Sequence, residues 1–222
     1  MTLHAFSYAK LPTYFKTILG LSGTVSCLTQ SQKEHLCSLK IDELYYFPSI
    51  YGQEQRVKVT MQTAETTDYI DELIKHIKLK SEVENRPVLV FCESFKSILN
   101  ITQHSNFQSE FPKALYLTIK NDGKMRDNII KRACMKNNVT LMEKQFARGT
   151  DIKQYDEGLS KKGGLHAIAT FIPDTKQDLV QCKGRTGRQG KPGTFCVFVP
   201  ETEFEKFHRK IGSREDPEEF LE

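Results

Sequence analysis

The run PVLVFC, residues 87–92, is continuously apolar. A strand with one face in water alternates apolar and polar residues, whereas a short continuous apolar run is typical of a strand buried on both faces. Strands of that kind occur in parallel sheets that helices cover on both sides. PVLVFC therefore predicts a strand at the centre of an α/β sheet.

Outward from this run, strand patterns and helix patterns alternate. A helix is expected over residues 63–85, where Ile70, Leu73 and Ile77 recur at helical spacing and Thr66 or Thr67 could cap the start. The other helical segments are 93–105, 126–137, one that Asp174 or Thr175 caps and that runs toward Arg188, and 201–211. The predicted strands are 56–61, 87–92, 114–119, 139–143, 165–171 and 194–199.

This alternation with short connections is typical of βαβ units. It predicts one mostly parallel sheet with helices on both faces. Ligands of such sheets meet the loops at the carboxyl ends of the strands. Two polar stretches fall at such ends: EKQFARGTD, residues 143–151, and the loop and helix that follow GLHAIATF, residues 164–171.

Composition places the chain among ordinary globular proteins, with 222 residues and a net charge of +4. Residues 201–222 hold eight acidic and four basic side chains, so residues 1–200 carry a mild basic excess. A mixed, solvated surface is favoured over the clustered basic stripe of a nucleic-acid-binding protein. No apolar run approaches the roughly 20 residues of a membrane span. The six cysteines form no CxxC pair, which favours reduced thiols over a zinc site and fits a cytosolic setting.

Two motifs carry candidate chemistry. In the first, Arg148, Gly149, Thr150 and Asp151 follow a strand and offer a hydroxyl, a carboxylate and a close backbone approach. The second is QCKGRTGRQG, residues 181–190, in which Arg185 and Arg188 are spaced to share a helix face. Guanidinium groups can bind a phosphate in a bidentate manner and stay charged.

Glycines stand beside both arginines of the second motif. Gly184 and Gly187 would each cost about 1 kcal/mol inside a helix relative to alanine. Glycines retained there indicate close packing against a neighbouring group.

Five segments occur in an order and spacing that resemble a known family: GLSGTV, PVLVFC, FARGTDI, KKGGLHAIAT and QCKGRTGRQGKPGTF. They are similar to the second nucleotide-binding lobe of the SecA family, the preprotein-translocase motors related to DEAD-box helicases. GLSGTV, residues 20–25, is similar to the glycine-threonine-glycine motif that ends the family's first lobe. RGTDI and QCKGRTGRQG look like the fifth and sixth helicase motifs.

The resemblance implies a single RecA-like lobe and a site for ATP. In the family, ATP lies between two such lobes. By resemblance, Arg188 would be the arginine finger and Arg185 its partner. Gln181 and Gly184 would support the nucleotide contact, and Arg148, Gly149, Thr150 and Asp151 would form the other wall.

The chain contains no GxxxxGK[ST] phosphate loop, and neither Asp42-Glu43 nor Asp156-Glu157 stands in a magnesium-binding DEAD motif. We therefore expect a P-loop NTPase-like fold without the P-loop, whose partner is a first lobe, in cis or in trans, that supplies Mg²⁺. The chain alone is not expected to hydrolyse ATP.

The expected organisation is a lead-in over residues 1–50, a motor lobe over 51–200 and an acidic helix or tail over 201–222. Further implied partners are a preprotein or a translocon-like membrane protein, with action in the cytoplasm or at the periphery of a membrane. Nucleic acid is a less favoured partner.

The chain departs from the family at Glu143-Lys144, where the family has threonine-asparagine, and at Phe171-Ile172-Pro173. Two other readings stay open: a helicase carboxy-terminal lobe, and a non-catalytic module derived from the SecA lobe. His166 is expected to be a hydrogen-bonded structural residue.

Overall fold

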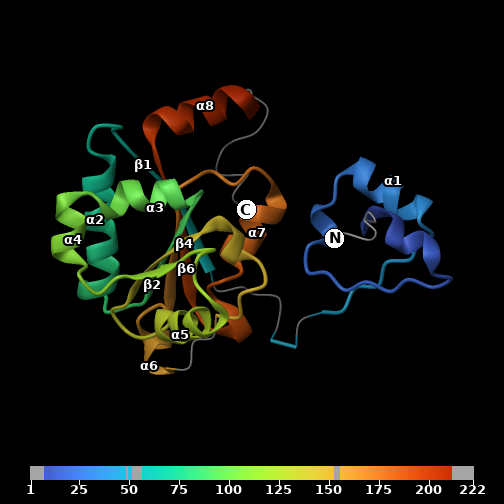
Figure 1. Ribbon diagram of the computed structural model, residues 1–222, viewed down its shortest axis with the longest axis horizontal. Helices are drawn as coiled ribbons and strands as arrows, with labels where there is room; N and C mark the ends of the chain where they lie inside the picture. The colour runs from blue at the N-terminus through green and yellow to red at the C-terminus, as the bar shows by residue number, and fades with distance from the viewer. Residues whose placement is uncertain (1–7, 49, 52–56, 153–155, 212–222) are drawn as a thin grey trace, which may run out of the picture. The chain divides into compact units, whose positions relative to one another are not determined.

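The structure, a computed structural model, describes residues 8–48, 50–51, 57–152 and 156–211 (Figure 1). The chain divides into two units, Met1–Ser49 and Ile50–Glu222. The first unit holds two 3-10 turns, Tyr8–Tyr14 and Val25–Cys27, and the helix α1, Gln30–Ser38. Thr29 and Gln32 form a capping box at the start of α1, so this helix is locally encoded. None of the described residues of the first unit is buried.

The second unit contains one sheet of six strands, in the order β1-β6-β5-β2-β4-β3, and every neighbouring pair is parallel. The prediction of a parallel α/β sheet is confirmed. The strands are β1 Val57–Ala64, β2 Val88–Cys92, β3 Leu115–Leu117, β4 Val139–Glu143, β5 Leu165–Ala169 and β6 Gly193–Pro200.

The strand formed by PVLVFC lies inside the sheet. β2 pairs with β4 on one side and with β5 on the other. Each of its five residues is buried, as are all five of β5. Burial on both faces removes the need for polar alternation, which is why the run reads as continuously apolar.

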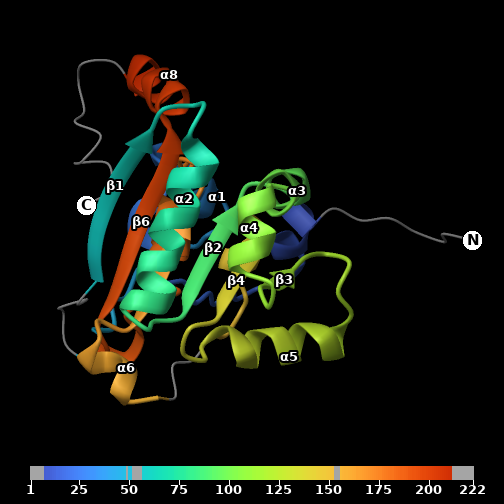
Figure 2. The same ribbon diagram turned by 90° about the vertical axis from the view of Figure 1, so that its left-hand side faces the viewer.

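Helices cover both faces of the sheet (Figure 2). On one face, Leu73 and Ile77 of α2 and Ile98 of α3 pack with alternate residues of the central strands. On the other face, Ala133 of α5 and Leu179 of α7 do the same. The helices of this unit are α2 Tyr69–Lys78, α3 Phe95–Thr102, α4 Ser105–Glu110, α5 Gly123–Ala133, α6 Gly158–Lys161, α7 Lys176–Lys183 and α8 Glu201–Ile211.

Some local predictions were wrong. The first residue before α2 is Asp68, so neither Thr66 nor Thr67 caps this helix. The hydroxyl of Thr66 instead bonds that of Thr202, 136 residues away at the start of α8. The helix expected over 93–105 is α3, which ends at Thr102, and a separate short helix, α4, begins at Ser105 after an extended His104. In the described part of the chain, no helix combines the length and apolar character needed to cross a bilayer.

Candidate functional site

The arginine motif lies in a loop after α7. The helix begins at a Thr175 cap, whose hydroxyl accepts from the backbone N–H of Asp178, and it ends at Lys183. Gly184 closes it with ordinary helical angles, and a Cβ there would lie 2.9 Å from the Val180 carbonyl oxygen. Gly187 then takes a left-handed φ of 64°. Arg185 and Arg188 therefore do not share a helix face, contrary to the sequence prediction, because the helix ends before both.

Glycine is required in this loop by close packing, as the sequence indicated. A Cβ on Gly187 would lie 2.2 Å from the Cγ2 of Val57, the first residue of β1. A Cβ on Gly193 would lie 2.0 Å from the Thr186 hydroxyl oxygen. Neither separation is possible for real atoms, so the loop rests directly on the starts of β1 and β6.

The site lies at the amino ends of the strands, not at the carboxyl ends where the sequence analysis expected it. The Thr186 hydroxyl donates to the carbonyl of Leu165, the first residue of β5, over 2.5 Å. α7 leaves the carboxyl end of β5 and runs back across the sheet before β6 begins. A motif at the end of such a helix is carried to the opposite edge of the sheet.

Arg185 is a buried residue that connects the two motifs. Arg185 is only 8% exposed, and its Nη1 donates to the Thr150 carbonyl. Its Nη2 donates to the Gln181 side-chain oxygen over 3.4 Å, and its Nε has no hydrogen-bond partner. Burial, together with the nearby positive charge of Arg188, lowers the pKa of this guanidinium below its usual value.

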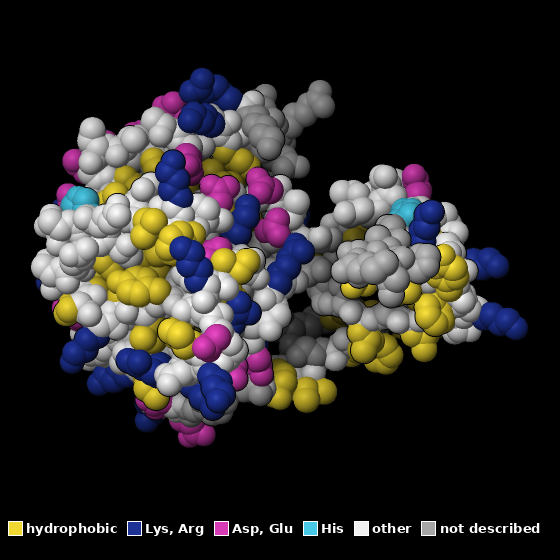
Figure 3. Space-filling model, viewed as in Figure 1, with side chains coloured by type: hydrophobic (Ala, Val, Ile, Leu, Met, Phe, Trp, Pro, Cys, Tyr) yellow, Lys and Arg dark blue, Asp and Glu magenta, His cyan; other side chains and the backbone are white. Residues whose placement is uncertain are grey.

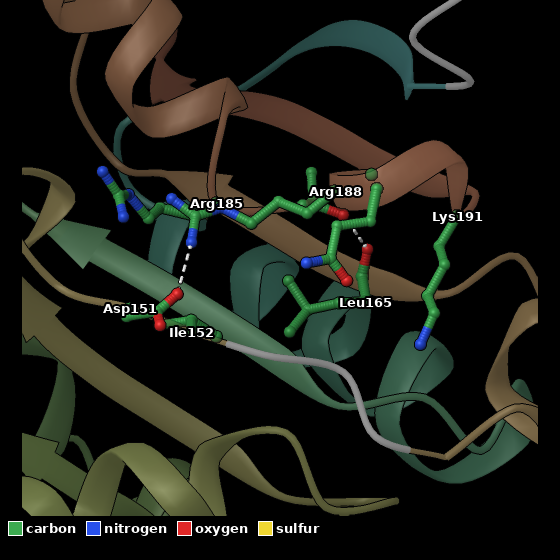
Figure 4. A pocket seen from close by; sticks show the side chains of 9 residues that line it. Asp151, Ile152, Leu165, Arg185, Arg188 and Lys191 are labelled. Carbon is green, nitrogen blue, oxygen red and sulfur yellow. Dashed lines mark hydrogen bonds and ion pairs between the residues drawn. The ribbon is translucent and has the colours of Figure 1, made fainter. Parts of the chain in front are cut away.

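Arg188 is more accessible than Arg185. Its Nε donates to the Gly184 carbonyl over 2.8 Å and its Nη1 to the Asp151 carboxylate over 3.0 Å (Figure 4). The Arg188 side chain is 36% exposed and that of Asp151 is 61% exposed. An ion pair this exposed is worth about 0–1 kcal/mol, so the arginine can exchange the carboxylate for another anion at little cost.

Arg148 lies apart from the other candidates. Its Nη2 donates to Asp178, in the first turn of α7, over 2.7 Å. The arginine loop follows the opposite end of that helix. Gly149 has a left-handed φ of 68°, and Thr150 is buried. Arg148 is thus bonded to the start of α7 and not to the other candidates. The candidates that the structure brings together are Thr150, Asp151, Gln181, Gly184, Arg185 and Arg188.

A hollow of about 50 Å³ opens between the two motifs (Figure 4). Its lining is Asp151, Ile152, Leu165, Arg185, Thr186, Gly187, Arg188, Gln189 and Lys191. One water molecule needs about 10–15 Å³ of such a cavity, so the hollow admits a small group rather than a whole nucleotide. Three cationic side chains and one carboxylate line it, and the Arg185 Nε has no hydrogen-bond partner. These residues fit an anion of phosphate size.

Sequence reasoning had not singled out Lys191 or Gln189. Lys191 directly follows the motif of residues 181–190, three residues beyond Arg188, and only the turn of the loop brings it to the hollow. Gln189 has a left-handed φ of 56°, which few residues other than glycine adopt. Nothing in the identity of a glutamine signals that conformation.

The two departures from the family pattern lie against each other at the carboxyl end of the sheet. The Lys144 ammonium is 3.6 Å from the Asp174 carboxylate and 3.8 Å from that of Glu93. It also lies 5.7 Å from the centre of the Phe171 ring. The two departures are therefore neighbours in the folded chain.

His166 is hydrogen-bonded on both ring nitrogens. Its Nδ1 lies 2.6 Å from the Thr194 hydroxyl, and its Nε2 lies 3.0 Å from the Nε2 of His76. It is 2% exposed. The prediction of a hydrogen-bonded structural histidine is confirmed. Among the described residues, no group of three or more potential metal-ligating side chains is found.

Comparison with known proteins identifies sequence relatives. No family model matches the chain. It is 30% identical over 191 residues to protein translocase subunit SecA 2 of Bacillus thuringiensis, which covers 85% of this chain. It is 26% identical over 210 residues, or 89% of this chain, to protein translocase subunit SecA of Mesomycoplasma hyopneumoniae. The chain spans only 23% and 19% of these two relatives' lengths.

Solved structures share the fold. Domain 2 of the DEAD-box helicase Mss116p, bound to an RNA duplex, covers 73% of this chain with a TM-score of 0.54 and 21% identity. That match spans 60% of the helicase chain. Mss116 bound to single-stranded RNA and UDP-BeF covers 83%, with a TM-score of 0.59 and 18% identity, over 37% of its own chain. These are RecA-like helicase lobes.

Proposed function

Because the chain is a SecA-related RecA-like lobe, we propose that it acts as the second lobe of an ATP-driven motor. In this role it contributes arginine side chains to a nucleotide that a first lobe holds. The observation that carries the proposal is the position of Arg188. Its guanidinium lies at the mouth of a cationic hollow and is held there by a backbone carbonyl and by an exchangeable carboxylate.

The two arginines have different parts in this proposal. Arg188 contacts the terminal phosphate and stabilises negative charge that develops during hydrolysis. Arg185 joins Thr150 to Gln181 and so keeps the two motifs at a fixed separation. Asp151 holds Arg188 until the phosphate replaces it, and it then faces the ribose side. Bound ATP supplies the phosphoryl group, and Mg²⁺ comes with the first lobe.

The relatives are named as protein translocase subunits, which supports a role in protein transport. We propose that the lobe acts in the cytoplasm or at the periphery of a membrane, together with a preprotein or a translocon-like protein. The first lobe is the necessary partner, because the chain has no phosphate-loop motif of its own.

The direct test supplies the first nucleotide-binding lobe of a SecA relative in trans and measures ATP hydrolysis. The unmodified chain should stimulate turnover. Arg188→Ala should lower kcat on the order of 10³-fold or more with little change in KM for ATP, because an arginine finger acts on the transition state. Arg188→Lys should restore little, since an ammonium lacks the planar fork.

The matched control is Arg132→Ala, which removes an exposed arginine of α5. It should leave turnover unchanged. Full activity of Arg188→Ala would remove the arginine-finger assignment, and failure of the unmodified chain to stimulate the first lobe would contradict the motor role.

The helicase alternative is less well supported. The SecA relative reaches 30% identity over most of the chain, whereas the helicase lobes share the fold at 21% or less. On the face shown in Figure 3, lysines and arginines are interspersed with acidic residues and form no single stripe. Anisotropy of a labelled single-stranded RNA distinguishes the two: a helicase lobe should bind it with an affinity that falls steeply with salt.

A further inference from the structure

Arg86 is a buried arginine outside the site described above. It lies two residues before β2 and is 3% exposed. Burying a guanidinium is costly unless its donors are satisfied. Here Nε donates to the Gly164 carbonyl over 2.7 Å, and Nη1 donates to Glu84 over 2.8 Å. Nη2 donates to the Gly163 carbonyl over 2.9 Å and to the Thr194 hydroxyl.

The turn that Arg86 binds is shaped to receive it. Gly163 and Gly164 have φ values of 90° and 72°, so both are left-handed. Their carbonyls face one guanidinium, and a Cβ on Gly163 would lie 3.4 Å from its central carbon. Two successive left-handed residues are readily available only to glycine. The pair of glycines is therefore explained by the arginine that it surrounds.

The residues that follow this turn are the floor beneath the arginine loop. Leu165 pairs with Gly193 where β5 and β6 begin. The Leu165 carbonyl accepts from Thr186, and Gly193 is packed against the same threonine. Arg86 bonds the residue before Leu165 and the residue after Gly193. It therefore joins the two strand ends on which the loop rests.

We infer that Arg86 is a positioning residue for Arg188. Arg86 does not itself line the hollow, although its Nη2 donates over 3.5 Å to the carbonyl of Leu165, which does. It acts through the strand ends, which set the height and tilt of the loop from Arg185 to Gln189. This inference rests on the proposed function, because a fixed position of Arg188 matters only if that side chain meets a ligand.

The test is hydrogen exchange by mass spectrometry on the full chain without nucleotide. Arg86→Lys keeps the charge but loses the fork that binds two carbonyls at once. Exchange of the amides of residues 185–190 should rise about tenfold, while β2 and β5 keep their protection. Arg132→Lys, an exposed arginine on α5, should change nothing. An unchanged loop, or an even rise across the whole lobe, would overturn the inference.

A second pair of variants serves if Arg86→Lys does not fold. Thr194→Val removes the hydroxyl that Arg86 and His166 share, and Thr194→Ser keeps it. The valine variant should loosen the loop and the serine variant should not. Equal exchange in the two variants would also overturn the inference.

Turnover with a supplied first lobe separates this inference from the proposed function. Arg86→Lys should lower kcat and leave KM for ATP within about twofold, since binding groups stay in place while the transition-state contact is misplaced. If the unmodified chain gives no turnover, the proposed function fails, whatever the exchange data show. If turnover is normal in Arg86→Lys, the positioning role fails and the proposed function stands.

Discussion

At the scale of single residues, burial separates two arginines that the sequence presents as a pair. Arg185 is enclosed and bonds a backbone carbonyl, whereas Arg188 bonds a carboxylate that is itself mostly exposed. A buried donor that is removed leaves its acceptor unsatisfied, and an exposed ion pair leaves little behind. The two side chains therefore differ in what their loss does to stability.

We predict that Arg185→Ala lowers the free energy of unfolding by about 3 kcal/mol, through lost packing and the orphaned Thr150 carbonyl. Arg188→Ala should cost no more than about 1 kcal/mol. Urea unfolding of both variants measures the difference. Equal losses would show that burial does not separate the two roles.

The buried histidine pair belongs to a chain of hydrogen bonds that includes Arg86 and Thr194. Arg86 can only donate, so the Thr194 hydroxyl accepts from Arg86 and keeps its own hydrogen available for His166 Nδ1. One set of tautomers that satisfies the chain has His166 donating from Nε2 to His76 Nε2, with the His76 proton on Nδ1. Burial lowers the pKa of His76 to about 4 and holds the pKa of His166 well below its usual value.

Acid should therefore destabilise the lobe through this pair. The unfolded chain binds these protons near pH 6.5, and the folded chain resists them until about pH 4 for His76. Stability should fall across that window by on the order of 3 kcal/mol for this residue. His76→Gln should flatten the pH dependence measured by urea unfolding, and His208→Gln, at an exposed position of α8, should not. The same slope in all three proteins would contradict the assignment.

At the scale of elements, the arginine loop is held by backbone conformation as well as by bonds. Gly187, Gln189 and Gly190 all have left-handed φ angles, so the chain reverses direction sharply around Arg188. A glycine meets that demand without strain, and the glutamine does not. These backbone angles fix the direction in which the loop presents Arg188.

Gly187→Ala should destabilise the lobe by about 2–3 kcal/mol, because the added methyl meets Val57 and the left-handed angle becomes strained. Adding Val57→Ala should restore only part of the loss, since it removes the collision and leaves the strain. Gln189→Gly should be nearly neutral. The glycine removes about 1 kcal/mol of backbone strain from the folded state, but it stabilises the unfolded chain by a similar amount through added conformational entropy. Thermal unfolding of the three variants checks this order.

At the scale of the whole molecule, the core of the second unit explains why it folds. Its two apolar clusters, one on each face of the sheet, draw on residues from Val57 onward. The described residues of the first unit include exposed Leu19, Leu21, Tyr46 and Phe47, and none that is buried. The second unit therefore has a hydrophobic core of its own, and we expect it to unfold cooperatively as one unit.

The isolated chain should not hydrolyse ATP above background with magnesium present. Phosphoryl transfer depends on positioning and on charge neutralisation, and the sequence has no phosphate-loop motif to provide them. Phosphate release from repeatedly purified protein is the measurement. Turnover that follows the protein through every purification step would mean that the chain has a nucleotide site of its own.

The sequence by itself determined the parallel sheet and the alternation of its strands and helices along the chain. Burial on both faces makes a strand such as PVLVFC apolar throughout, and helical spacing marks Leu73 and Ile77, so these signals are local. The packing of the glycines was readable for the same reason: Gly187 costs stability in any regular element and so indicates a close neighbour.

Only the tertiary structure decided where the motifs meet. Helix α7 carries the arginine loop to the amino ends of the strands, and burial then makes Arg185 an anchor and leaves Arg188 accessible. Arg86 gave no signal in the sequence, because all of its hydrogen-bond partners except Glu84 lie 77 to 108 residues away. Contacts between residues that far apart depend on the path of the whole chain, and no pattern within a short window encodes them.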